Sequence, residues 1–133
     1  MKEVSTIKIN EILREKWVGL NFIWNFDRKL ILLPVIKMKQ ILDDLHEMPR
    51  FRYEVFDCDD FALITHAFVK LSIGKNKDYK YNVAFGEALI RSPGEGTHVL
   101  NLFIADDESI WFFDAQLKQI ETNYFCEVLY VRF

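Results

Sequence analysis

The sequence is poor in cysteine and lacks both a long apolar run and a signal peptide. It contains two cysteines, Cys58 and Cys126, which do not indicate the disulfide framework of a small secreted domain. No apolar run reaches the roughly 18 residues that a membrane-spanning helix needs, and residues 1–5 lack the charged and then apolar pattern of a signal peptide. We therefore expect no membrane partner and a reducing cytoplasm, either of a cell or, for a phage-encoded protein, of its host.

An excess of basic residues is also absent. The chain has 17 Lys and Arg against 20 Asp and Glu, a net charge of −3 and a pI of about 5.6. Without a basic patch we exclude nucleic acid as a partner. With only 3 prolines and 5 glycines, the sequence shows no linker or low-complexity tract. Because half of the 133 residues are hydrophobic, we expect one domain over 1–133 with a substantial core.

The hydrophobic spacing changes along the chain. Apolar residues at helical spacing predict helices over 6–16, 34–47 and 57–72. Strand-forming residues predict strands over 79–90, 97–105, 109–115 and 126–133, while 21–33 stays open between a short strand and irregular structure. Helices followed by strands predict an α+β fold in which N-terminal helices pack on one face of a C-terminal antiparallel sheet.

The most informative stretch is the start of the third predicted helix. Asp57 is a suitable N-cap, and Cys58, Asp59 and Asp60 then fall in the first turn. The positive end of the helix dipole stabilises a thiolate there, which is one way to make a cysteine nucleophilic. The alternative is that Cys58 is a small buried hydrophobic residue near a helix cap.

A base and an acid are predicted on the hairpin over 97–115. If the turn lies at 106–107, His98 faces Asp114 or Ala115, close enough for an imidazole and a carboxylate to interact. A slip of one residue would turn them to opposite faces. Cys58, His98 and Asp114 then form a candidate nucleophile, base and orienting acid. The alternatives are an interior histidine and an exposed acid at a strand end.

Two other residues compete poorly for these roles. His66 is eight residues along the helix from Cys58, or about 12 Å at 1.5 Å per residue. Cys126 lies in a predicted strand with no acid–base partner, and we interpret it as a core or spare thiol.

Three motifs carry a resemblance to a known family. The order of DCDDFAL (57–63), THVLNLFI (97–104) and WFFDAQ (111–116) resembles papain-like, transglutaminase-like cysteine hydrolases. Among these it is most similar to the C-terminal peptidase domain of the Marasmius oreades agglutinin family and its stand-alone bacterial and phage relatives. The resemblance implies a papain-like core, with Cys58 as nucleophile, His98 as base and Asp114, beside Gln116, as the orienting acid. The sequence departs from the family pattern in having Val99 rather than an aromatic residue after the histidine, and Asp rather than Glu at position 114.

These predictions describe a peptidase or amidase that acts on a peptide or protein. The Cys58 thiolate would attack the carbonyl, and the oxyanion would be held by the Cys58 backbone N–H and by a donor from Asn21, Trp24 or Asn25. Two alternatives stay open. In the first, the chain is an inactive papain-like module that binds or inhibits a protein. In the second, it is a structural domain in which Cys58 is merely buried.

Calcium is the one cofactor that the resemblance suggests. Three carboxylates beside a thiol should raise the pKa of the thiol, and a bound cation would relieve this. Relatives of the agglutinin type use calcium, and Asp59 and Asp60, supported by Asp57, are suitable oxygen ligands. The alternative is a helix cap with solvated acids in the first turn.

Overall fold

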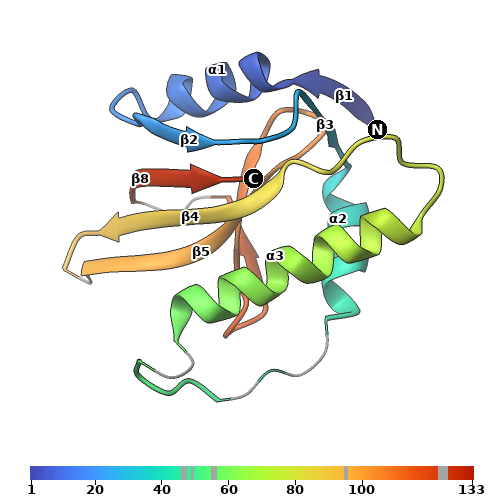
Figure 1. Ribbon diagram of the computed structural model, residues 1–133. Coiled ribbons are helices and arrows are strands. Elements are labelled where there is room, and N and C mark those ends of the chain that lie inside the picture. The colour runs from blue at the N-terminus through green and yellow to red at the C-terminus, as the bar shows by residue number, and fades with distance from the viewer. Residues whose placement is uncertain (46–47, 49, 55–56, 95, 123–125) are drawn as a thin grey trace.

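The computed structural model describes residues 1–45, 48, 50–54, 57–94, 96–122 and 126–133. Within these ranges the helices are α1 (Thr6–Lys16), α2 (Val35–Asp43) and α3 (Cys58–Lys75). The strands are β1 (Lys2–Ser5), β2 (Phe22–Trp24), β3 (Lys29–Leu32), β4 (Phe85–Ser92), β5 (Gly96–Ile104), β6 (Ile110–Asp114), β7 (Gln119–Glu121) and β8 (Glu127–Arg132). Figure 1 shows their arrangement.

A sheet of six strands forms the middle layer of the fold. Its order is β2–β8–β4–β5–β6–β7, and β1 pairs with β3 in a separate two-stranded sheet. Every neighbouring pair in the large sheet is antiparallel except β2 and β8, which run parallel. The sheet therefore mixes strand directions and includes a strand from the first quarter of the chain.

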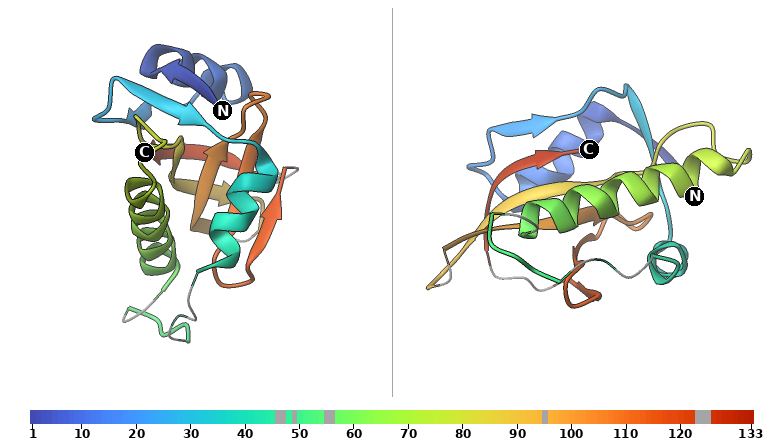
Figure 2. Two further views of the ribbon diagram at one scale, coloured as in Figure 1. Left: turned by 90° about the vertical axis from the view of Figure 1, so that its right-hand side faces the viewer. Right: turned by 60° about the horizontal axis from the view of Figure 1, so that its bottom comes forward.

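The helices cover both faces of this sheet (Figure 2). On one face α1 buries Ile9, Ile12 and Leu13 in a cluster with Ile90 of β4 and Leu102 of β5. On the other face α2 and α3 share a second cluster, whose residues include Met38, Val69, Phe85 and Phe103. Because neighbouring residues of a strand point to opposite faces, each central strand contributes to both clusters.

The sequence patterns explain why these helices form where they do. Ser5 caps α1 by accepting a hydrogen bond from the Lys8 N–H at 3.2 Å, and the predicted span of 6–16 is confirmed. Helix α2 starts after Pro34 and ends at Asp43, while its predicted end at residue 47 lies outside the described residues. The third helix continues past its predicted end at residue 72 to Lys75.

The predicted fold class is wrong. We expected N-terminal helices on one face of a C-terminal antiparallel sheet with a papain-like core. The described residues instead form mostly β-structure, a six-stranded and a two-stranded sheet, with α1 and α3 on opposite faces of the larger sheet. The expectation failed because β1, β2 and β3 are only 4, 3 and 4 residues long. Such short strands carry too few residues for an alternating pattern to stand out, and the parallel partner of β2 is more than 100 residues away in sequence.

None of the described helices combines the length and the apolar character needed to cross a lipid bilayer. The cytoplasmic location expected from the sequence stays a prediction.

Candidate functional site

Helix α3 begins as the sequence predicts, with Asp57 as N-cap and Cys58 as the first helical residue. The Asp57 N–H donates to the Asp60 carboxylate at 3.1 Å, which forms one half of a capping box. The Glu54 N–H donates a hydrogen bond to Asp57 Oδ2 at 3.2 Å. The Cys58 thiol is free and half-buried. The helix start is therefore an ordered turn in which hydrogen bonds hold the Asp57 and Asp60 carboxylates.

The carboxylates of Asp57, Asp59 and Asp60 lie close to one another. One oxygen from each falls within 4.8 Å of the others, a spacing that one cation could bridge. The hydrogen bond that the protonated Asp57 carboxyl donates to the Asp59 side chain, together with desolvation and the negative charge of Asp59, raises the pKa of Asp57. Calcium takes six to eight oxygen ligands, so an ion held here would also need water or backbone oxygens.

Two buried polar residues show which face of the sheet lies beneath α3. Asn101 of β5 donates from Nδ2 to the backbone oxygens of Ala62 at 2.9 Å and Gly86 at 3.1 Å. Glu87 pairs with Asn101 across the β4–β5 ladder and contacts His66 of α3. Residues 87 and 101 therefore point towards α3, and the residues next to them point away.

This alternation sends His98 to the other face of the sheet. His98 is three residues before Asn101 and pairs with Ile90, whose side chain belongs to the cluster under α1. Leu100 and Leu102, which share the face of His98, belong to the same cluster. The His98 side chain therefore leaves the sheet on the α1 side, whereas Cys58 belongs to the helix on the opposite side.

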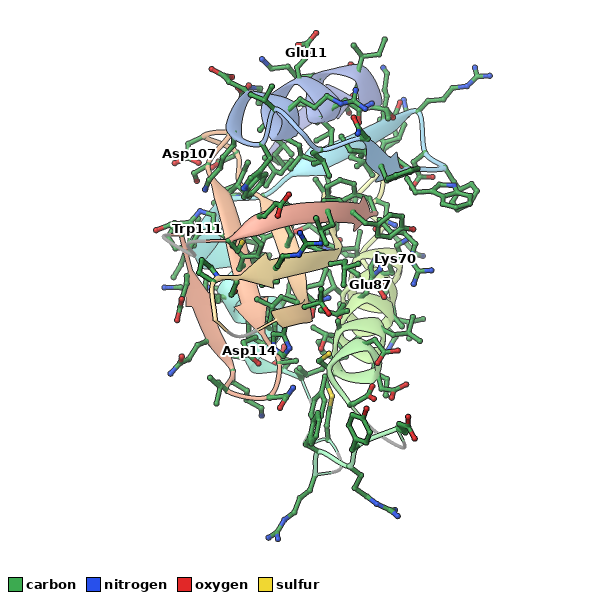
Figure 3. All side chains as sticks on the ribbon, turned by 90° about the vertical axis from the view of Figure 1, so that its left-hand side faces the viewer. Glu11, Lys70, Glu87, Asp107, Trp111 and Asp114 are labelled. Atoms are coloured by element: carbon green, nitrogen blue, oxygen red, sulfur yellow. The ribbon has the colours of Figure 1, made fainter. Side chains whose placement is uncertain are left out.

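Asp114 lies on the same face of the sheet as His98, but the two residues do not stand opposite each other in the β5–β6 ladder. The β5–β6 ladder pairs Asn101 with Phe113, and continuing it places Asp114 opposite Leu100, so the predicted pairing with His98 is wrong. Asp114, labelled in Figure 3, accepts hydrogen bonds through its carboxylate from the N–H groups of Gln116 at 2.9 Å and Leu117 at 3.3 Å. These bonds close the turn after β6. It also lines a small cavity of about 170 Å³ with Leu100.

The structure therefore does not bring the predicted residues together. Among the described residues, no hydrogen bond or ion pair joins Cys58, His98 and Asp114. The Gln116 backbone contacts Asp114, while Asn25 follows β2, which β8 and β4 separate from β5. The catalytic assignment of these residues stays a prediction from the sequence.

Cys126 fits its interpretation as a core thiol. It packs against the cluster under α1, and burial raises the pKa of its thiol to about 11, an effect that the nearby Lys16 partly offsets. A thiol with that pKa is almost entirely protonated at neutral pH.

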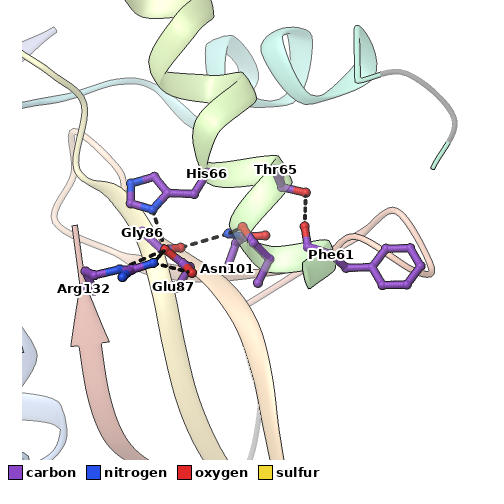
Figure 4. A network of polar contacts seen from close by, with 8 residues as sticks. Phe61, Thr65, His66, Gly86, Glu87, Asn101 and Arg132 are labelled. Atoms are coloured by element: carbon purple, nitrogen blue, oxygen red, sulfur yellow. Dashed lines mark hydrogen bonds and ion pairs between the residues drawn. The ribbon is translucent and has the colours of Figure 1, made fainter. Parts of the chain in front are cut away.

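A polar network between α3 and the sheet was missed by the sequence analysis. His66 Nδ1 lies 2.7 Å from Glu87 Oε2, and Arg132 of β8 donates to both oxygens of the same carboxylate at 3.0 and 2.8 Å (Figure 4). Burial alone would raise the pKa of Glu87, but the bonds from His66 and Arg132 outweigh it and hold the pKa below its ordinary value of 4.5. Sequence spacing gave no signal because the three residues lie on three separate elements.

Beside this network the sheet carries exposed aromatic side chains. Phe22 and Trp24 of β2 pair with Tyr130 and Arg132 of β8, and the four residues share the face on which Arg132 meets Glu87. Phe22 is 69% and Trp24 55% exposed. We call Phe22, Trp24, Tyr130 and Arg132 the β2–β8 aromatic surface. Helix α3 packs on β4 and β5 and leaves this edge of the face uncovered (Figure 1).

Comparisons with known proteins identify the fold. The family model described as Agglutinin C-terminal matches residues 31–120. No curated protein matches the sequence.

Two solved structures are similar over 98% of this chain, each with a TM-score of 0.81. One is described as a PSL1a-E64 complex, with 21% identity over 51% of that chain. The other is the Polyporus squamosus lectin bound to the human-type influenza-binding epitope Neu5Aca2-6Galb1-4GlcNAc, with 20% identity over 49% of that chain. The chain thus spans about half the length of the solved chains that it matches, and a single domain over 1–133 stays a prediction.

These findings correct the functional predictions. The fold is shared with a lectin described as bound to a glycan, and the matching family is named for agglutinins. The prediction of a papain-like cysteine peptidase or amidase is therefore wrong, as are an inactive papain-like module and a peptide substrate as partner. The placement of His98 and Cys58 on opposite sides of the sheet agrees with this correction. The agglutinin part of the resemblance is confirmed.

Proposed function

The chain belongs to the agglutinin C-terminal family, and we propose that it is a non-enzymatic carbohydrate-binding domain whose glycan site is the β2–β8 aromatic surface. The observation that carries the proposal is the exposure of Phe22 and Trp24 beside Arg132, on a part of the sheet that no described helix covers. A contiguous exposed apolar patch rimmed by polar groups is typical of an interaction site.

The chemistry of this surface suits a sugar ring. One face of a pyranose presents C–H groups, which are attracted to the negative face of an aromatic ring. Trp24 and Phe26 lie together, with ring centroids 5.8 Å apart at a tilt of 38°, so they offer a broad aromatic area. Such residues supply contact area at a low cost in side-chain entropy, since only two side-chain torsions are fixed on binding.

Arg132 adds a polar anchor next to the rings. Its guanidinium is held by Glu87 at 2.8 and 3.0 Å, while its side chain remains 41% exposed. A guanidinium in a fixed orientation donates well to hydroxyl and carboxylate oxygens. Because the Polyporus lectin is described with a sialylated epitope, an acidic terminal sugar is a suitable first probe for this chain.

The test is a direct binding measurement. We expect the protein to bind at least one glycan of a panel that includes the sialylated trisaccharide, and Trp24→Ala to weaken that binding about tenfold, or about 1.4 kcal/mol. Tyr53→Ala is the matched control, since Tyr53 is 77% exposed and lies in the segment before α3. The proposal fails if no glycan binds, or if the Trp24 and Tyr53 variants bind equally well.

We also propose that calcium binds at the start of α3. The oxygen donors of Asp57, Asp59 and Asp60 fit a hard dication. The hydrogen bond with Asp59 and desolvation raise the pKa of Asp57, and the negative charges of Asp59 and Asp60, which a bound ion would offset, add to this. The small number of protein ligands predicts weak binding.

A further inference from the structure

A cavity of about 510 Å³ lies at the free end of the β4–β5 hairpin, where the residues just before β8 also reach. Figure 1 shows this hairpin at the end of the sheet that is far from α2. The volume falls within the range of about 300 to 1,000 Å³ that is usual for small-molecule sites. We call it the hairpin cavity.

The hairpin cavity has a floor of two residues and an exposed rim. Ser92 is 8% exposed and Cys126 is half-buried, and these two residues form the floor. The remaining lining residues are exposed and surround the opening: Arg91, Pro93, Gly94, Gly96 and Glu127. A small molecule can therefore enter from solvent and become buried against the floor.

Strand pairing places the two floor residues side by side. Ser92 is the last residue of β4, and the β4–β8 ladder ends with Arg91 opposite Glu127. Continuing that ladder by one residue puts Ser92 opposite Cys126. Because Cys126 packs against the cluster under α1, the floor belongs to the α1 face of the sheet. The β2–β8 aromatic surface lies on the other face, where Arg132 meets Glu87.

Glycine keeps one side of the hairpin cavity free of side chains. Gly94 and Gly96 have φ angles of +78° and +76°, in the left-handed region that glycine adopts without a steric cost. A Cβ atom built at either position would meet no described atom within 4 Å. The turn thus borders open space rather than packed side chains.

The Ser92 hydroxyl has no hydrogen-bond partner in the part of the chain that the structure describes. A buried polar group without a partner costs free energy, so such groups are normally bonded to protein, water or a ligand. A hydroxyl both donates and accepts, so one oxygen atom of a ligand at the floor would satisfy it.

The charges around the hairpin cavity are paired or absent. Arg91 and Glu127 form an ion pair at 3.4 Å across the rim. Burial raises the pKa of the Cys126 thiol to about 11, so the thiol is uncharged at neutral pH. Lys16, which partly offsets this rise, holds its ammonium group 5.0 Å from the centre of the Trp17 ring. These groups favour a neutral ligand over a charged one.

We propose that the hairpin cavity binds a neutral phenol, with the aromatic rings against Pro93 and Cys126 and the hydroxyl bonded to Ser92. Sulfur makes favourable contacts with aromatic rings, and proline offers an apolar surface without a donor. The proposal is independent of the glycan site, which lies on the other face of the sheet.

The first test compares two probes of similar shape, naphthol and methylnaphthalene, in which a methyl group replaces the hydroxyl. We expect saturable binding of naphthol to the wild-type protein by equilibrium dialysis, with a weaker affinity for methylnaphthalene. Ser92→Ala should weaken naphthol binding about three- to tenfold and leave methylnaphthalene binding unchanged, because only naphthol loses a hydrogen bond. Ser72→Ala is the matched control, since its hydroxyl bonds the Phe68 carbonyl within α3 and should affect neither probe.

The fold of Ser92→Ala is checked by thermal melting. The variant removes an unpaired buried hydroxyl, so it should melt no lower than the wild-type protein. A loss of naphthol binding can then be assigned to the missing hydroxyl.

Thiol labelling locates the bound probe. In a Cys58→Ser protein Cys126 is the one thiol left, and naphthol should slow its reaction with N-ethylmaleimide in proportion to occupancy. In a Cys126→Ser protein the same probe should leave the labelling of Cys58 unchanged. The proposal is overturned if naphthol does not bind the wild-type protein, if Ser92→Ala binds both probes as the wild type does, or if naphthol protects the two thiols equally.

Discussion

Glu87 joins α3 to β8 through a single carboxylate. His66 and Arg132 both bond to it, and its side chain is 11% exposed. Replacing it with Gln removes the charge while keeping the shape, so Arg132 and His66 lose their charged acceptor. We expect Glu87→Gln to lower the free energy of unfolding by about 1–3 kcal/mol in chemical denaturation at neutral pH. Glu127→Gln is the control, since its pair with Arg91 is exposed and should change stability by less than about 1 kcal/mol.

The pH dependence of this effect has a definite sign. The pKa of Glu87 is lower in the folded protein than its ordinary value of 4.5, so on acidification the unfolded chain takes up the proton first. The stabilisation by Glu87 is thus present above pH 4.5 and is lost as pH falls through the lowered folded value. The stability difference between wild type and Glu87→Gln should shrink below pH 4.5, and a difference that grows with acidification would contradict the network.

Calcium is expected to stabilise the start of α3. We expect added calcium to raise the melting temperature of the wild-type protein, because three mutually repelling carboxylates would gain a shared counter-ion. Asp59→Asn should remove the effect while leaving the capping bond between Asp57 and Asp60 in place. Asp106→Asn, in the acidic turn after β5, serves as the control. An equal calcium response in both variants would count against this site.

Among the strands, the closest backbone approach constrains the pairing of β4 with β8 at Gly86. A Cβ added at Gly86 would lie 2.0 Å from the backbone oxygen of Arg132, which is far inside contact distance. Since neither backbone can move without breaking the β4–β8 ladder, we expect Gly86→Ala to destabilise the protein by about 3 kcal/mol.

Gly19→Ala is the matched control for this prediction. Gly19 has open space around its Cβ position, so the variant should change the thermal midpoint little. A Gly86→Ala protein that melts with the wild type would contradict the close approach of the two strands.

Local structure was easier to predict than pairing. The spacing of Ile9, Ile12 and Leu13 located α1 correctly, and Asp57 marked the start of α3 because capping depends on neighbouring residues. The register of β5 with β6 could not be fixed in the same way, since a turn that differs by one residue moves Asp114 from His98 to Leu100. The close approach of Gly86 to β8 and the register shift between Leu89 and Ile90 likewise depend on pairing with a distant strand.

In the whole molecule, α1 and α3 pack on opposite faces of the sheet, and this separates the residues of the predicted site. Cys58, His98 and Asp114 occur in the order that the family resemblance implied, but no local signal says whether α1 or α3 covers the His98 side of β5. The β2–β8 aromatic surface was missed for the same reason. It depends on a parallel pairing between Trp24 and Arg132 that joins the two ends of the chain.

The central claim is that Phe22, Trp24, Tyr130 and Arg132 form a glycan site. The most direct measurement is an NMR titration of the assigned, isotope-labelled protein with the glycan that binds best in the panel. We expect saturable chemical-shift changes concentrated on β2 and β8, with the Trp24 indole N–H among the largest. Changes confined to other strands, or none at any glycan concentration, would contradict it.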